Sequence, residues 1–102
     1  MNPLFQLSTR SYDKEIPIIK SALEQLEKEC NAKNGYVIEE PFQKFGWTFF
    51  NIQISEEMVG IIEKSGMMEG ALGYRIGEQM TNFIGHYLET KGSSVRIKKI
   101  DY

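Results

Sequence analysis

The sequence predicts an α+β fold in which helices cover one face of a mostly antiparallel sheet, in the order β-α-β-β-α-α-β. Apolar residues recur at steps of three and four over residues 16–30, as in an amphipathic helix, whereas apolar and polar residues alternate over 47–54, as in a strand. Glycine, proline and asparagine separate these segments. The 102 residues, 41% hydrophobic and 25% charged, are expected to form a single folded domain over 1–102.

The first two elements are expected to be a strand and a long helix. The segment Leu4–Thr9 is short, partly apolar and compatible with a strand. Asp13 is the expected N-cap of the helix, and Pro17 then falls in its first turn, where proline is tolerated. Asn34 and Gly35 are expected to end the helix, because both tolerate the left-handed conformation.

This first helix carries a narrow apolar seam. Because the seam is only one side chain wide, it is of the kind that two helices share, and it is a candidate surface for self-association. The seam consists of Ile16, Ile19, Leu23, Leu26 and Cys30.

Two strands are expected next. The first covers Tyr36–Ile38 and is ended by Pro41, and a turn at Phe45 and Gly46 leads into the second, over 47–54. Alternation along this second strand predicts a core-facing set made of Thr48, Phe50, Ile52 and Ile54.

Trp47 and Phe49 share the opposite face of that strand. Either another element covers these two rings, or they are aromatic anchors for a partner, which protein interfaces favour.

The second half is expected to hold a short helix from Ser55 to about Lys64, a long helix over 66–90 and a final strand over 93–100. Glycine costs about 0.8–1 kcal/mol relative to alanine in a helix interior. At 100° per residue, four glycines of the long helix fall in one stripe, which is therefore expected to be a close-contact surface. The candidate contact surface consists of Gly66, Gly70, Gly73, Gly77 and Met80, with Trp47 and Phe49 as its aromatic anchors.

The sequence offers no catalytic constellation. His86 is the only histidine and Cys30 the only cysteine, so a zinc site built from Cys and His is excluded. Cys30 lies on the apolar seam, where a thiol behaves as a small hydrophobe, and His86 is expected at the surface. No catalytic residue, metal ligand or cofactor is predicted, and the chain is expected not to be an enzyme.

Charge and hydropathy also limit the function. The net charge of −2 and the pI near 5.4 argue against a dedicated nucleic-acid binder. No apolar run is long enough to span a membrane, and the N-terminus lacks the pattern of a signal peptide. We therefore expect a cytoplasmic protein.

The C-terminal third carries a family resemblance. Residues 66–72 read Gly-Met-Met-Glu-Gly-Ala-Leu and are followed by Phe83, Leu88, Gly92 and a charged–apolar strand over 94–98. This pattern resembles the C-terminal part of TRAPP (transport protein particle) vesicle-tethering subunits, within the wider group of vinyl-4-reductase-like domains. In that group the Gly-x-x-x-Gly-Ala-Leu segment is a helix that packs on an antiparallel sheet.

The resemblance implies a non-catalytic α+β module that dimerises through helices and holds an apolar or acyl ligand between helix and sheet. Bacterial and archaeal members of the group often carry metal-binding cysteines, and Cys30 alone does not match them. No functional residue is therefore carried over.

Together these observations predict a non-catalytic protein-interaction module, either a homodimer or bound to another protein. One alternative is a domain that binds an apolar small molecule or lipid in a pocket lined by Met67, Met80, Phe50 and Tyr74.

A second alternative is a small acidic inhibitor or immunity-type protein that blocks a basic partner enzyme by charge. The acids that would carry this function are Glu56, Glu57, Glu63 and Glu69.

Overall fold

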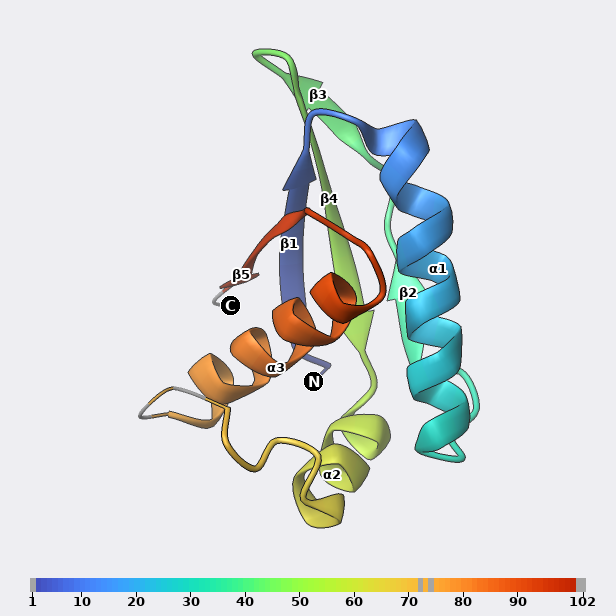
Figure 1. The fold of residues 1–102 in the computed structure, drawn as a ribbon, viewed down its shortest axis with the longest axis vertical. Helices are drawn as coiled ribbons and strands as arrows, with labels where there is room; N and C mark the ends of the chain where they lie inside the picture. The colour runs from blue at the N-terminus through green and yellow to red at the C-terminus, as the bar shows by residue number, and fades with distance from the viewer. Residues whose placement is uncertain (1, 72, 74, 101–102) are drawn as a thin grey trace.

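The computed structural model describes residues 2–71, 73 and 75–100 (Figure 1). Within this part of the chain it confirms the predicted α+β class and the predicted order of elements, and it adds one short strand, β3. The elements are β1 (Leu4–Thr9), α1 (Tyr12–Glu29), β2 (Tyr36–Ile38), β3 (Phe42–Lys44), β4 (Trp47–Ile54), α2 (Glu56–Ser65), α3 (Ile76–Thr90) and β5 (Arg96–Ile100).

The strands form one antiparallel sheet in the order β2-β4-β1-β5. β3 lies on the same side of β4 as β2, against the other end of the strand: Tyr36 pairs with Ile54, and Lys44 pairs with Trp47. Helix α1 connects β1 to β2 with β4 between them, and α2 and α3 connect β4 to β5 with β1 between them. The sheet therefore contains two interlocked split βαβ units.

The tight turn between β3 and β4 consists of Phe45 and Gly46. Both residues have positive φ, 53° and 80°, as a two-residue hairpin turn of type I′ requires. The turn lies at the upper end of the long axis of the molecule in Figure 1, at the opposite end from α2.

The hydrophobic core lies between the sheet and the helices, on a single face of the sheet. The predicted inward set of β4 is buried, as are Phe5 and Leu7 of β1. Figure 1 views the sheet from this side, with α3 crossing in front of β1. The helices contribute Ile19, Ala22, Leu23 and Leu26 from α1, Met58 and Ile62 from α2, and Met80, Ile84 and Leu88 from α3.

Helix α1 differs from its prediction in three respects. It ends at Glu29, with Cys30 as its C-cap, and not at Asn34 and Gly35. It begins at Tyr12 after Ser11, so Asp13 lies inside the first turn and is not the N-cap. Its apolar seam is core: Leu23 and Leu26 are fully buried within the single chain, and Cys30 nearly so. The buried part of the seam is therefore not available to a second copy of the chain, and Ile16 is only partly buried.

The prediction of one long glycine-striped helix over 66–90 is wrong. Helix α3 begins only at Ile76, and Gly66, Gly70 and Gly73 have φ values of +81°, +90° and +138°. These left-handed conformations favour glycine and cannot continue a right-handed helix. Gly66 instead ends α2 as its left-handed cap, and of the four glycines only Gly77 lies in a helix.

A buried carboxylate connects the first turn of α1 to the segment that leads into β5. Glu15 is 3% exposed and accepts hydrogen bonds from Ser93 Oγ at 2.9 Å, Ser94 Oγ at 2.7 Å and the Ser94 backbone N–H at 3.1 Å. Burial by itself would raise the pKa of Glu15, but the hydrogen bonds from Ser94 and Ser93 outweigh it and hold that pKa below its ordinary value. We call this arrangement the Glu15 clasp.

Among the residues described, no helix is both long and apolar enough to cross a membrane.

Candidate functional site

All helices of the described residues lie on the core side of the sheet, and we call the opposite face of the sheet the uncovered face. Cross-strand register places its side chains in rows, because residues that pair directly share a face. Ser8 lies opposite both Phe49 and Arg96, and Phe42 lies opposite Phe49 on the far side. One row therefore runs Phe42, Phe49, Ser8, Arg96 across the sheet, and the neighbouring rows hold Lys44 with Trp47, and Glu39, Asn51, Gln6 and Lys98.

Aromatic side chains gather at the hairpin end of this face. The rings of Phe42 and Phe49 stack with centroids 5.4 Å apart and planes 19° apart. Phe42 is 51% exposed, as is Val37 of β2, and Phe45 in the turn is 89% exposed. The three most exposed large hydrophobic side chains among the described residues therefore all lie along the β2–β3 edge and its turn.

Trp47 contacts two arginines from distant parts of the sequence. Arg10, just after β1, places its guanidinium carbon 5.4 Å from the ring centroid, and Arg96, at the start of β5, places its own at 4.9 Å. At an exposed site each such cation–π contact contributes about 0.5–1 kcal/mol. Within the described part of the chain, neither arginine forms a salt bridge. Both guanidinium groups therefore keep donors available to an anionic partner.

The carboxylate on this face is already hydrogen-bonded. Glu39 accepts from Asn51 Nδ2 at 3.2 Å and from Gln53 Nε2 at 2.7 Å, and its backbone N–H donates to the Asn51 carbonyl at 2.8 Å. Glu39 therefore pairs with two amides and not with either arginine. The cations of the uncovered face are Arg10, Lys44, Arg96 and Lys98.

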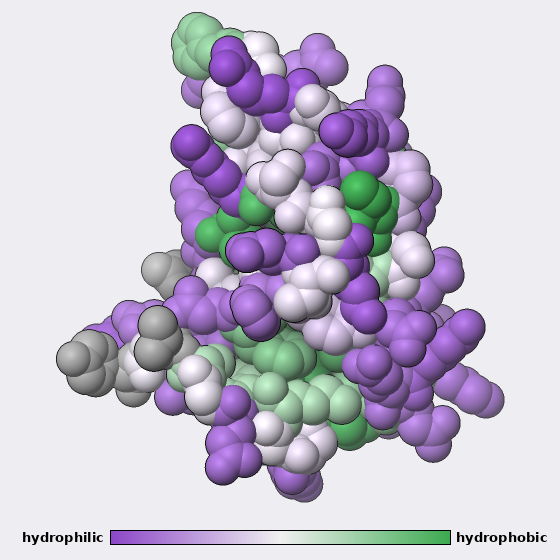
Figure 2. Space-filling view, viewed as in Figure 1, coloured by the Kyte–Doolittle hydropathy of each residue, from purple (hydrophilic) through white to green (hydrophobic). Residues whose placement is uncertain are grey.

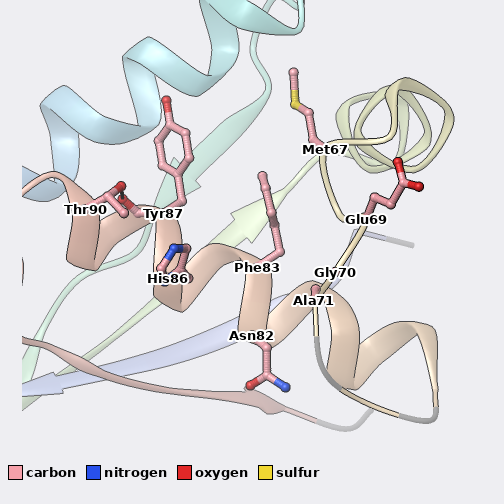
Figure 3. A pocket seen from close by; sticks show the side chains of 9 residues that line it. All are labelled: Met67, Glu69, Gly70, Ala71, Asn82, Phe83, His86, Tyr87 and Thr90. Atoms are coloured by element: carbon pink, nitrogen blue, oxygen red, sulfur yellow. Dashed lines mark hydrogen bonds between the residues drawn. The ribbon is translucent and has the colours of Figure 1, made fainter.

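A second hollow lies on the helical side of the molecule, between the segment that follows α2 and the exposed side of α3. We call it the α3 groove; Figure 3 shows it, and its volume is about 600 Å³. Seen from the helical side in Figure 2, apolar surface gathers between α2 and α3. The groove is lined by Met67, Glu69, Gly70, Ala71, Asn82, Phe83, His86, Tyr87 and Thr90.

The polar groups of the α3 groove do not form a catalytic pair. Tyr87 Oη lies 3.2 Å from Glu29 Oε2, and burial together with the negative charge of Glu29 raises the pKa of Tyr87 to about 12. His86 is exposed, as predicted, on the same helix. A phenol of such high pKa, which donates its hydrogen bond to a carboxylate, is poorly suited to act as a general acid or base near neutral pH.

The structure does not bring the seven predicted contact residues into one surface. Trp47 and Phe49 lie together on the uncovered face. Met80 is core, and Gly77 lies against the side chain of Lys99. The remaining three, Gly66, Gly70 and Gly73, lie in the segment between α2 and α3.

The predicted apolar pocket is also dispersed. Phe50 and Met80 are buried in the core, whereas Met67 lines the α3 groove. Tyr74 lies outside the described residues, as does Leu72 of the family-like segment. The Cys30 thiol is buried, and burial, together with the charge of Glu29, raises its pKa, as befits a packing residue.

Sequence reasoning missed Phe42, Arg10 and Arg96 as neighbours of Trp47 and Phe49. A signal for Phe42 was present: a two-residue turn at 45–46 pairs Lys44 with Trp47 and therefore Phe42 with Phe49. The two arginines carried no such signal, because only the pairing of β1 with β4 and β5 brings them to Trp47.

The described residues contain no group of three His, Cys, Asp or Glu side chains arranged to hold a metal ion. The segment that resembles the helix of TRAPP subunits forms turns at 66–70, so the helical part of that expectation is wrong here. Comparison of the chain with protein-family models, with curated proteins and with solved structures gives no match, and the TRAPP resemblance itself stays a prediction.

Proposed function

We propose that this chain is a non-catalytic binding module whose contact surface is the uncovered face of the sheet. The observation that carries the proposal is that Trp47 contacts both Arg10 and Arg96 on a sheet face over which no described helix lies. Tryptophan and arginine are the residues that most often dominate binding energy at interfaces.

Charge and exposure support the same surface. The cations Arg10 and Arg96 have no carboxylate partner among the described residues, and Glu39 is occupied by two amides. Phe42 keeps half of its surface exposed although it stacks on Phe49. An anionic partner with apolar or flat groups would satisfy the arginines and cover the exposed ring. A protein partner or a second copy of the chain, as the sequence predicts, is one form that such a partner can take.

The test compares wild-type protein with the variant Phe42→Ser, Trp47→Ser, Arg96→Ser. These side chains are outside the core, so we expect the variant to fold, as checked by circular dichroism and urea unfolding. Immobilised wild-type protein should retain a partner from host lysate, identified by mass spectrometry and by nucleic-acid quantification, and the variant should lose it.

The matched control carries three substitutions on the solvent-exposed side of α1: Lys14→Ser, Lys20→Ser and Lys28→Ser. It should retain the same partner as the wild type. Equal retention by the wild type and the uncovered-face variant would contradict the proposal.

The α3 groove favours a second candidate function, the binding of an apolar small molecule. The groove of about 600 Å³ is of the size that accommodates a small ligand, and Met67, Phe83 and Tyr87 give it apolar walls. Native mass spectrometry of protein purified from its host should then show a retained mass that is lost in Phe83→Asp and kept in the groove-distant Ser21→Asp. The absence of any retained mass in the wild type would count against this candidate.

A further inference from the structure

We propose that the occupant of the uncovered face is single-stranded nucleic acid, an inference that rests on the proposed binding function of that face. Single strands are bound without strong sequence preference by surfaces that combine stacking aromatic rings with cations that follow the phosphate backbone. The hairpin end of the uncovered face combines the same two elements, and they lie side by side.

The aromatic rings are spaced for successive bases. Trp47 and Phe49 are two residues apart on one side of β4, which places them about 7 Å apart along the strand. Phe42 extends the stacking surface from Phe49 toward the edge of the sheet, with its ring half exposed. Bases stacked in a duplex are only about 3.4 Å apart and hide their flat faces, so the spacing suits splayed single-stranded bases.

The cations lie on both sides of the rings. Lys44 pairs with Trp47 on the β3 side, and Arg96 lies beyond Ser8 on the β5 side, so a backbone crossing the strands meets a cation at each end. Lys98 continues the cationic side two residues along β5. Guanidinium groups donate paired hydrogen bonds to phosphate, and among the described residues neither Arg10 nor Arg96 is in a salt bridge, while both lie over the Trp47 ring.

The net charge of −2 does not oppose this inference, because the charges are segregated. The acidic residues Glu56, Glu57 and Glu63 lie on α2, at the opposite end of the long axis from the β3–β4 turn (Figure 1). At physiological ionic strength, interactions between exposed charges are screened beyond about 8 Å. A nucleic-acid strand on the uncovered face therefore meets four cations, Arg10, Lys44, Arg96 and Lys98, and, among the described residues, the carboxylate of Glu39.

The carboxylates of an acidic polypeptide would satisfy Arg10 and Arg96. An acidic side chain has no flat face to stack on Phe42 and Phe49, whereas every nucleotide carries both an anionic phosphate and a flat base. The stacked, half-exposed pair of rings favours nucleic acid, and the test separates the two partners.

Trp47 is the only tryptophan in the chain, so its fluorescence reports directly on this site. We expect octathymidylate or octauridylate to quench Trp47 emission in a saturable titration. If three to four cations contact phosphates, the logarithm of the association constant should fall against the logarithm of salt with a slope of about −2 to −3, at about 0.7 per contact.

Two variants retain Trp47 as the fluorescent probe and separate the contribution of base stacking from that of phosphate contacts. Phe42→Ala should weaken binding by about 5- to 150-fold, the range for loss of one base-stacking ring, with little change in the salt slope. Arg96→Gln should weaken binding and reduce the slope by about 0.7. Lys64→Gln, which removes an exposed cation from α2, is the matched control and should change neither quantity.

Three results would overturn the inference. The first is no quenching and no binding of either oligonucleotide at low salt. The second is equally tight binding of inorganic polyphosphate that is unaffected in Phe42→Ala, because simple charge attraction would then suffice. The third is binding of a polyglutamate peptide in preference to the oligonucleotides, which assigns the face to an acidic protein. In each case the retention experiment with the uncovered-face variant still decides separately whether the face binds a partner at all.

Discussion

Strand β4 presents two opposite faces that differ in almost every physical respect. Phe50 points to the core, is fully buried and meets Tyr12 edge to face with centroids 5.3 Å apart. Its neighbour Phe49 points the other way, is only partly buried and stacks on the half-exposed Phe42. Two adjacent residues of the same type therefore belong to different parts of the molecule, one to its stability and the other to its contact surface.

The largest effect on stability is expected when a charged side chain is introduced on the core side of the molecule. Leu23→Glu should abolish folding, because Leu23 is fully buried and an unpaired buried carboxylate is not tolerated. The matched change Ser21→Glu, on the exposed side of the same helix, should alter the free energy of unfolding by less than about 0.5 kcal/mol. Urea unfolding followed by circular dichroism measures both. A folded monomer of Leu23→Glu would mean that the seam of α1 is an interface after all.

The two phenylalanines of β4 test the comparison most directly. Phe50→Ala should lower the free energy of unfolding by about 3–5 kcal/mol, since it removes a buried ring from the core. Phe49→Ala should lower it by about 1 kcal/mol, mainly through the lost stacking with Phe42. Equal losses in the two variants would show that the uncovered face is as important to stability as the core.

The Glu15 clasp links the two sides, because it secures the start of β5, whose Arg96 lies on the uncovered face. Glu15→Gln should lower stability at neutral pH by about 1–3 kcal/mol, through weaker hydrogen bonds to Ser93 and Ser94.

The clasp also predicts a dependence on pH. The folded-state pKa of Glu15 lies below its ordinary value of 4.5, so its stabilisation is fully present above that pH and is lost as the pH falls through the folded-state pKa. The free energy of unfolding should be measured from about pH 6 to about pH 3, which spans the ordinary pKa of a glutamate. Over this range Glu15→Gln should lose less stability than the wild type. Parallel pH profiles would assign the acid sensitivity to other carboxyl groups.

Alanine substitution at two glycines of the supposed stripe should change the free energy of unfolding with opposite signs. Gly73→Ala should destabilise the fold by about 1–3 kcal/mol, because Gly73 has φ +138° and an added Cβ would meet the backbone N of Gln79 at 3.0 Å. Gly77→Ala should stabilise it by up to about 1 kcal/mol, because Gly77 is helical and its new methyl meets no backbone outside its own helix, only the long side chain of Lys99, 3.0 Å from Cδ. Thermal unfolding of both variants measures the two effects. Destabilisation of similar size in both would contradict the expected stabilisation at Gly77 and would indicate that both glycines are closely packed.

These comparisons also show what the sequence can predict. The seam of α1 and the alternation of β4 are periodic, and periodic burial follows from local geometry alone. Gly66, Gly70 and Gly73 fit a helical period equally well, but glycine is compatible with both handed conformations, so spacing alone could not reveal that they break the helix.

Only part of the candidate site could be predicted from the sequence, for a related reason. Trp47 and Phe49 follow from the alternation within one strand. Arg10 and Arg96 reach Trp47 only through pairing between strands more than thirty residues apart in sequence, which no local pattern encodes. The net charge of the chain gave no indication of these two arginines either, because it sums the acidic residues of α2 with the cations of the sheet.

The two-residue alternation of β4 has a consequence for how the protein can evolve. The odd positions from Trp47 to Gln53 lie on the uncovered face, and the even positions from Thr48 to Ile54 lie in the core. Substitutions at the odd positions can therefore change which partner the domain binds while the core stays the same. Insertion or deletion of a single residue inside the strand is a different event. It exchanges the two sets on one side of the change, so that an insertion just before Phe50 would turn Phe50 and Ile52 outward while Trp47 keeps its place, and it would disturb both recognition and stability in one step. Relatives of this chain should accordingly vary freely in the amino acids at the odd positions and not in the length of the strand.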